Sequence, residues 1–240
     1  MNIIIPLGGK GERFKKEGYL LPKPLIKVLN KEILFHVIDN LKINENDHVF
    51  IIYNKELDEH NFSEIITLKY PNIKLIKLTH DTKGATETLN IGLSYILNNY
   101  PYHDKTIIID GDTFYIDDII TKFRNIDLFN AIYYVKNYDT NPIFSYISLD
   151  EDQLITNIQE KIKISDNANT GAYAFNSIYQ LLDYSYYVLD NNISFKGECY
   201  TSCIISEMMK VNELFIGIEV HNVHVLGTPL QVNEFINLHS

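Results

Sequence analysis

The chain opens with MNIIIPLGGKGERF, residues 1–14, and continues after a short loop with PKPLIKV, residues 22–28. A run of isoleucines stops at two glycines, and a third glycine follows two positions later. A strand that only turned a corner would need one glycine. Glycines let backbone N–H groups approach a ligand closely, while Arg13 and Lys23 would add positive charge nearby. This stretch therefore predicts a strand followed by an anion-binding loop.

The loop matches neither of two common phosphate-binding motifs. A P-loop requires G-x-x-x-x-G-K-[ST], but Gly11 is followed here by Glu12. A dinucleotide-binding fingerprint requires G-x-G-x-x-G, but Phe14 stands where the third glycine would be. A Rossmann dehydrogenase is therefore disfavoured. The spacing of the glycines and cations alone is also compatible with the alternative to an anion-binding loop, a surface loop with solvated lysines.

Length and charge indicate a globular domain and argue against a nucleic-acid-binding protein. The 240 residues can bury a sizeable core, and the formal net charge of −10 argues against a nucleic-acid partner. A few local cations can still bind a phosphorylated small molecule.

No apolar run approaches ~18 residues, and the N-terminus lacks a signal-peptide pattern. With only Cys199 and Cys203 there is no disulfide framework, so we expect a cytoplasmic protein without a membrane partner. A homo-oligomer stays open.

Residues 1–115 alternate between strand and helix patterns. The expected strands cover residues 3–7, 48–53, 72–78 and 106–109, and apolar residues at helical spacing fall within 34–41 and 89–97. Strands separated by helices imply βαβ crossovers and a parallel sheet that is covered on both faces. We therefore expect an α/β fold, a Rossmann-like three-layer αβα arrangement with a mostly parallel central sheet.

Residues 116–240 are richer in strand patterns. The expected strands cover residues 131–135, 144–149, 154–159, 171–175 and 214–220, and the expected helices cover 178–189 and 200–210. We expect this part to add a small β-rich region to the sheet. No repeat or linker divides the chain, so residues 1–240 are predicted to form a single domain.

Three segments follow expected strands directly: Gly8–Arg13, His80–Thr86 and Asp110–Asp112. In an open parallel sheet, ligands bind outside the carboxyl ends of the strands, so these segments predict one common site. A carboxylate at the end of a buried strand is costly unless it is paired or binds a metal. This argument favours a functional role for Asp112, whereas Asp110 is as readily a cap or turn residue.

Further matches extend along the chain. They are LGGKGERF (7–14), PKPLIKV (22–28), GATETL (84–89), IIDGDTFY (108–115), QEK (159–161), NTGAYAF (169–175) and LGTPLQV (226–232). Together they resemble the sugar-1-phosphate nucleotidyltransferases, also called nucleoside-diphosphate-sugar pyrophosphorylases. This family includes single-domain phosphocholine cytidylyltransferases. The matches are ordered, correctly spaced and cover nearly the whole chain.

The resemblance implies a nucleotidyltransferase of this kind. The phosphate of a sugar 1-phosphate attacks the α-phosphorus of a nucleoside triphosphate, pyrophosphate leaves, and an NDP-sugar for glycan biosynthesis is formed. It also implies that residues 1–115 bind mainly the nucleotide and 116–240 mainly the acceptor, with Mg²⁺ as cofactor. Two alternatives stay open: a cytidylyltransferase for a non-sugar phosphate such as phosphocholine, and a nucleotide-binding regulator without activity.

The resemblance also assigns roles to residues. Catalytic cations would be Arg13 at the triphosphate, Lys23 between the reacting phosphates and Lys161 at the acceptor phosphate. The nucleotide would contact Leu7, Gly8, Gly9, Gly11, Gly84 and Ala85. The acceptor would contact Gly111, Glu160 and an expected turn formed by Asn169, Thr170 and Gly171. Asp112 would bind Mg²⁺. From the residues alone, Lys161 could equally be a solvated lysine at the end of a strand.

The sequence departs from the family pattern at Val225, where many relatives carry a second metal-binding aspartate. Either Asp112, phosphates and water hold the metal, or a neighbour such as His224 or Asn222 contributes. Residues 79–83 contain no recognisable reader of the base, and we favour a pyrimidine nucleotide. Because the chain ends at Ser240 without an acyltransferase-like solenoid, we expect it not to be the bifunctional version of the family.

Overall fold

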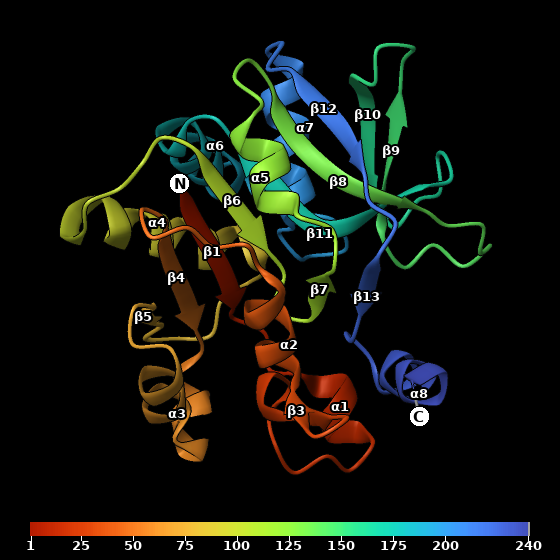
Figure 1. The fold of residues 1–240 in the computed structure, drawn as a ribbon. Helices are drawn as coiled ribbons and strands as arrows, with labels where there is room; N and C mark the ends of the chain where they lie inside the picture. The colour runs from red at the N-terminus through yellow and green to blue at the C-terminus, as the bar shows by residue number, and fades with distance from the viewer. Residues whose placement is uncertain (240) are drawn as a thin grey trace.

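The central sheet combines strands from both halves of the chain. The computed structural model describes residues 1–239, and within them one sheet has nine strands (Figure 1). Its parallel part, in spatial order, consists of β6 (Thr106–Ile109), β1 (Asn2–Leu7), β4 (His48–Tyr53) and β5 (Lys74–Lys77). These strands match the four predicted in the first half, although β5 is shorter than expected.

The second half adds mainly antiparallel strands to this sheet. β11 is antiparallel to its neighbours β6, β8 and β9. β10 is antiparallel to β9, and β12 is parallel to β8. Their bounds are β8 (Asn130–Lys136), β9 (Ser145–Leu149), β10 (Ile155–Glu160), β11 (Asn167–Phe175) and β12 (Phe215–Glu219). The predicted α/β fold, with a mostly parallel sheet extended by further β structure, is confirmed.

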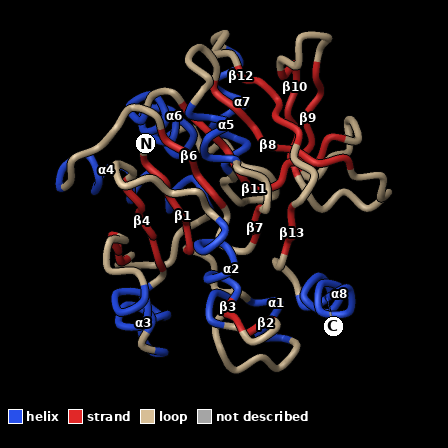
Figure 2. The backbone as a smooth tube through the Cα atoms, in the orientation of Figure 1, coloured by secondary structure: helices blue, strands red, loops and turns tan. Residues whose placement is uncertain are grey.

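Helices cover both faces of the sheet, as the three-layer prediction requires (Figure 2). One face packs against α2 (Ile33–Asn40), α3 (Phe62–Lys69) and α5 (Ile119–Arg124). The other packs against α4 (Ala85–Asn99), α6 (Ile178–Asp190) and α7 (Thr201–Lys210). Side chains alternate along β1, so Ile3 and Ile5 enter the first layer and Ile4 the second. This burial on both sides explains why β1 reads as a continuous apolar run.

Further elements, most of them short, surround the carboxyl edge of the sheet. They are α1 (Glu12–Lys16), η1 (Lys23–Leu25), β2 (Lys27–Val28), β3 (Lys31–Glu32), η2 (Lys55–His60), β7 (Thr113–Tyr115), β13 (Val223–Val225) and α8 (Pro229–His239). β7 and β13 form a separate antiparallel pair that joins the end of the chain to the segment after β6. The sequence patterns predicted none of α1, α3, α5, α8, β7 and β13. No helix within residues 1–239 has the length and apolarity to span a membrane.

One local prediction was wrong. The residues Asn169, Thr170 and Gly171 do not form a turn before a strand, because β11 already begins at Asn167. All nine residues of β11 are buried, and its register against β8 shifts between Asn169 and Tyr173. Gly171 has a φ of 84°, so the turn-like residues mark an irregularity inside the strand. The antiparallel pairing with β6 brings this irregularity to the carboxyl edge of β6.

Candidate active site

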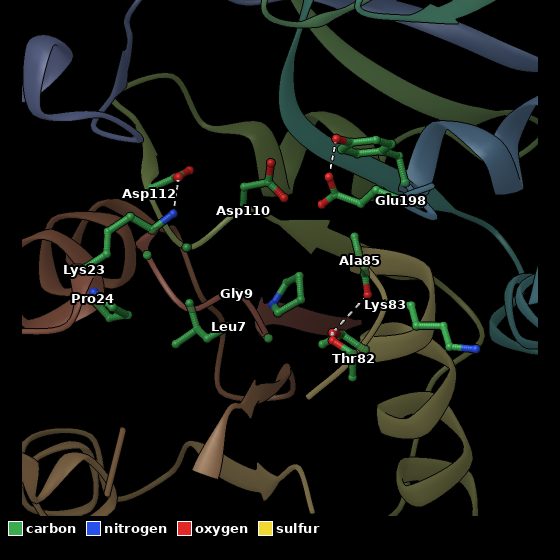
Figure 3. Close-up of a pocket in the computed structure, with 17 residues that line it drawn as sticks. Leu7, Gly9, Lys23, Pro24, Thr82, Lys83, Ala85, Asp110, Asp112 and Glu198 are labelled. Carbon is green, nitrogen blue, oxygen red and sulfur yellow. Dashed lines mark hydrogen bonds and ion pairs between the residues drawn. The ribbon is translucent and has the colours of Figure 1, made fainter. Parts of the chain in front are cut away.

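The glycine loop after β1 lies tightly against the start of α4. A Cβ atom added to Gly8 would lie 2.2 Å from Oγ1 of Thr88, so only glycine fits between β1 and α4. Gly11 has a φ of 68° and precedes α1, which carries Arg13. The backbone of this loop borders a cavity of about 480 Å³ at the carboxyl edge of the sheet (Figure 3). This position is the one predicted for the anion-binding loop.

The cations of this loop separate into two groups. Lys10 forms ion pairs with Glu56 at 3.2 Å and with Asp81 at 2.6 Å, so it is neutralised locally. Arg13 is exposed and, within residues 1–239, has no hydrogen-bonding or ion-pair partner. Lys23 borders the 480 Å³ cavity, and both Arg13 and Lys23 border a second, adjacent cavity. Among the cations of residues 8–23, Arg13 and Lys23 are therefore the ones that line these cavities.

Gly84 and Ala85 form the opposite wall of the first cavity, where α4 begins. Gly84 has a φ of 149°, and a Cβ atom there would lie 2.6 Å from the carbonyl oxygen of Cys199. Nearby, the hydroxyl groups of Thr82 and Thr88 share a hydrogen bond of 2.7 Å. The predicted nucleotide-contacting residues all line this cavity: Leu7, Gly8, Gly9, Gly11, Gly84 and Ala85.

A pair of opposite charges stands where the two cavities meet. Nζ of Lys23 lies 2.6 Å from Oδ2 of Asp112, and both residues line both cavities (Figure 3). Burial raises the pKa of Asp112, but the Lys23 ammonium and hydrogen bonds from Lys23 and Thr113 outweigh this and leave the pKa below its ordinary value. Asp112 is therefore an anion at neutral pH.

Asp110 is the second carboxylate at this junction. Burial, followed by the negative charge of Asp112, raises the pKa of Asp110 above its ordinary value, and Lys23 offsets only part of this effect. A buried carboxyl whose ionisation is hindered by a neighbouring carboxylate is typical of a site that receives a cation or keeps a proton. The sequence alone did not distinguish Asp110 from a cap or turn residue.

We expect the substitution Asp110→Asn to stabilise the protein in the absence of ligands, increasingly so as pH rises. The unfolded chain ionises this carboxyl near pH 4, whereas the folded protein ionises it only at higher pH, so rising pH favours the unfolded state. Asparagine removes this effect. The gain in Tm over the wild type should grow by roughly 3–6 °C between pH 5 and pH 7 in thermal unfolding without Mg²⁺.

Asp118→Asn provides the control for this measurement. Oδ1 of Asp118 caps α5 by accepting a hydrogen bond from the backbone N–H of Thr121, and asparagine caps helices equally well. Its Tm difference from the wild type should be small at both pH values. A gain for Asp110→Asn that is the same at pH 5 and pH 7 would contradict the raised pKa.

The second cavity has a volume of about 320 Å³ and lies between β11, β10 and the segment after β13. Among the predicted acceptor-contacting residues, it is lined by Glu160, Asn169, Thr170 and Gly171, together with Lys161. Gly111 instead lines the first cavity, because it packs against Leu7 of β1. Arg13, predicted at the triphosphate, lines the second cavity and not the first.

Asn169 lines this cavity, and its buried side-chain nitrogen, Nδ2, has no hydrogen-bond partner in the described part of the chain. Its side chain is nearly fully buried, and its Oδ1 accepts a hydrogen bond of 2.7 Å from the backbone N–H of Gly171. A buried amide nitrogen without a partner is costly, so Nδ2 is suited to an acceptor group on a ligand. The Thr170 hydroxyl, in contrast, is occupied by Tyr133 and Tyr115.

Glu160 presents a carboxylate to the same cavity. Ser202 Oγ donates a hydrogen bond of 2.7 Å to its Oε2. Burial raises the pKa of Glu160, although this hydrogen bond and Lys161 act in the opposite direction. The cavity therefore combines an amide donor, a carboxylate and the Lys161 ammonium, a combination that fits a polar, phosphorylated molecule.

Val225 stands where the family resemblance implies a second metal-binding aspartate beside Asp112. Val225 pairs with Thr113 across the β7–β13 ladder and lines the second cavity. The suggested substitutes do not face Asp112: Nδ2 of Asn222 donates to Asp117, and the His224 ring stacks on Phe114 with 4.9 Å between ring centroids. Neither His224 nor Asn222 is therefore supported as a metal ligand.

A metal ion at this site would need oxygen atoms from the substrate. Within residues 1–239, no group of three or more His, Cys, Asp or Glu side chains could hold a metal ion unaided. Asp112, with Asp110 beside it, provides one or two carboxylates at the junction of the cavities. Mg²⁺ is commonly held by one or two carboxylates together with phosphate oxygens and water, so this donor set fits Mg²⁺.

Three further polar residues at the site were not predicted. Glu198 and Tyr200 line the first cavity, Tyr200 also lines the second, and Gln231 lines the second. The sequence offered little to find them, because none belongs to a glycine-rich or paired-carboxylate pattern. Their place near Lys161 and Asp112 depends on how α7 and α8 pack.

Comparisons with known proteins show the family of this chain and its fold. A family profile described as nucleotidyl transferase matches residues 2–212. The bifunctional protein GlmU of Methanocaldococcus jannaschii is 27% identical over 244 residues, which cover 98% of this chain and 54% of the relative. The chain thus spans about half the length of that curated relative.

Two solved structures share the fold at low sequence identity. The nucleoside-diphosphate-sugar pyrophosphorylase of Vibrio cholerae RC9 has a TM-score of 0.86 at 20% identity, over 98% of this chain and 99% of that one. The CTP:phosphocholine cytidylyltransferase of Streptococcus pneumoniae has a TM-score of 0.75 at 14% identity, over 100% of this chain and 99% of that one.

Proposed function

Because the chain belongs to the nucleotidyl transferase family, we propose that it transfers a nucleoside monophosphate from a nucleoside triphosphate to a phosphorylated small molecule and releases pyrophosphate. The preferred acceptor in this proposal is a sugar 1-phosphate, which gives an NDP-sugar for glycan biosynthesis in the cytoplasm. One observation carries the proposal: two polar cavities meet at the Lys23–Asp112 pair, so two anionic reactants can lie side by side there.

The proposed reaction needs no general base. A phosphate monoester has a second pKa of about 6, so it is mainly a dianion at neutral pH and can attack directly. One of its oxygens forms a bond to the α-phosphorus, while the bond from that phosphorus to the oxygen shared with the β-phosphate breaks, and this oxygen leaves as part of pyrophosphate. The protein must therefore align two anions and stabilise the charge that develops.

Each available cation has a defined place in this proposal. Lys23 lies at the junction and lines both cavities, whereas Arg13 on α1 and Lys161 line the acceptor cavity. The backbone of the glycine loop binds the triphosphate through its N–H groups. When Mg²⁺ is bound, it would neutralise part of the triphosphate charge, with Asp112 as its protein ligand.

The polar groups of the second cavity favour a hydroxylated acceptor. The unpaired Nδ2 of Asn169 needs a hydrogen-bond acceptor, and the Glu160 carboxylate needs a donor. The hydroxyl groups of a sugar ring supply both. A trimethylammonium group supplies neither, so it would leave Asn169 unpaired.

A second candidate acceptor is phosphocholine. Aromatic side chains of Phe144, Tyr173 and Tyr200 line the second cavity together with the Glu160 carboxylate. Aromatic faces and a carboxylate attract quaternary ammonium groups through cation–π and Coulomb interactions. This candidate is consistent with the cavity lining but does not satisfy Asn169.

A panel of substrates tests the proposal. The wild-type protein with Mg²⁺ is incubated with ATP, CTP, GTP or UTP and with hexose 1-phosphates or phosphocholine, and released pyrophosphate is measured. We expect release with one pyrimidine triphosphate together with a hexose 1-phosphate. Release only with phosphocholine would support the second candidate. A raised Tm with a triphosphate but no pyrophosphate from any pair would contradict the proposed activity and indicate a nucleotide-binding regulator.

A further inference from the structure

Tyr200 stands between the two cavities and lines both of them. It is the residue just before α7, and its backbone is attached to the start of α4. Thr86 Oγ1 donates a hydrogen bond of 2.8 Å to the carbonyl oxygen of Tyr200, and the backbone N–H of Thr86 donates one of 3.0 Å to that of Cys199. The backbone of Tyr200 is therefore held between the starts of α4 and α7.

The Lys161 ammonium is in direct contact with this side chain. Nζ of Lys161 donates a hydrogen bond to the Tyr200 hydroxyl and lies 4.3 Å from the centroid of the ring. Lys161 follows β10 with a φ of 52°, and its backbone N–H donates to the carbonyl oxygen of Phe144 at 2.9 Å. Backbone and side chain of Lys161 are thus both held in place.

Glu198 orients the tyrosine hydroxyl. This hydroxyl donates a hydrogen bond to the Glu198 carboxylate, which lines the first cavity (Figure 3). Glu198 belongs to a tight turn that is closed by two backbone hydrogen bonds with Phe195, of 3.0 and 3.1 Å. Because the hydroxyl proton points to Glu198, its oxygen lone pairs face Lys161.

Burial and the neighbouring carboxylate raise the pKa of Tyr200, so the hydroxyl keeps its proton at neutral pH. The order of the three groups is therefore fixed: the carboxylate accepts from the hydroxyl, and the hydroxyl accepts from the ammonium. An ammonium group has three N–H donors, so two remain free for a phosphate after one is given to Tyr200.

We propose that Tyr200, oriented by Glu198, is a positioning residue that holds the Lys161 ammonium at the boundary where the acceptor phosphate meets the triphosphate. The inference rests on the proposed function. A lysine side chain is long and flexible, and holding it in advance removes an ordering cost from acceptor binding. Tyr200 lines both cavities, but Lys161, through which it would act, lines only the second, so the effect of Tyr200 should fall mainly on the acceptor.

Kinetics of Tyr200→Phe test this inference. Phenylalanine keeps the ring beside Lys161 but removes the hydroxyl, so we expect the KM for the acceptor phosphate to rise about tenfold. The KM for the triphosphate should stay within about twofold, and Tm should be unchanged. Tyr200→Leu, which also removes the ring, should raise the acceptor KM further. Tyr186→Phe removes a hydroxyl that contacts Ser94 on the surface and should leave all three quantities as in the wild type.

A double-mutant cycle with Lys161→Met separates positioning from direct contact. If Tyr200 acts through Lys161, adding Tyr200→Phe to Lys161→Met should change the acceptor kcat/KM less than twofold. A full effect in that background, or an unchanged acceptor KM in Tyr200→Phe alone, would overturn the inference. Absence of turnover in the wild type would overturn the proposed function and this inference with it. If the wild type is active, the proposed function stands, and the kinetics of the variants test this inference alone.

Discussion

Replacing Asp112 with asparagine is expected to lower kcat for pyrophosphate release about 10²–10³-fold and to leave the protein folded. Asp112 is the carboxylate that remains ionised at the junction of the cavities, and Lys23 balances its charge. Asparagine keeps the shape and can still accept a hydrogen bond from Lys23, so Tm should change by only a few degrees. The amide is, however, a much weaker Mg²⁺ ligand than the carboxylate.

The dependence on Mg²⁺ identifies the cause of this loss. If Asp112 holds the metal, the variant should need a higher Mg²⁺ concentration for half-maximal activity, which a titration at saturating substrates measures. Asp118→Asn, the matched replacement at the start of α5, should behave as the wild type. A variant at Asp112 with wild-type kcat and Mg²⁺ dependence would refute the assigned role.

The substitution Arg13→Ala is expected to reduce kcat/KM about 10²–10³-fold. Arg13 is exposed, and its guanidinium has no ionic partner within residues 1–239, so its removal should cost little stability. Its planar fork can bind phosphate oxygens in a bidentate manner, which a lysine cannot reproduce. Arg13→Lys should therefore recover only part of the activity.

Lys16→Ala is the matched control for Arg13. Both residues are exposed cations on α1, but only Arg13 lines a cavity at the site. Steady-state kinetics of the two variants should differ by at least tenfold in kcat/KM. Similar losses in both would mean that the general positive charge of α1 attracts the substrates, and that Arg13 makes no specific contact.

The parallel half of the fold was predictable because its signals are local. β1 is buried on both faces and so reads as a continuous apolar run, and β4 and β6 have the same character. The helices α3 and α5, in contrast, were not predicted; α3 is as long as α2 but buries only Phe62 and Ile66. The pairing of β7 with β13 joins residues more than 100 positions apart, so no local pattern could predict it.

The residues of the candidate site also differ in how far the sequence predicts them. The glycine loop and Asp112 were predictable from the residues because both follow strands of the parallel sheet. Asn169 and Lys161 were found only through the family resemblance, since antiparallel pairing of β11 and β10 determines where they lie. The role of Tyr200 could not be predicted, because it depends on contacts between a lysine, a tyrosine and a glutamate in distant segments.

The central claim is that the junction at Asp112 binds a triphosphate with its divalent ion beside an acceptor phosphate. A crystal structure with Mn²⁺ and a non-hydrolysable CTP or UTP analogue tests it through the anomalous signal of manganese. The account predicts one peak at about 2.1–2.3 Å from a carboxylate oxygen of Asp112, in contact with analogue phosphates that lie along residues 8–13. Manganese and phosphates bound elsewhere, with Asp112 still paired to Lys23 alone, would contradict it.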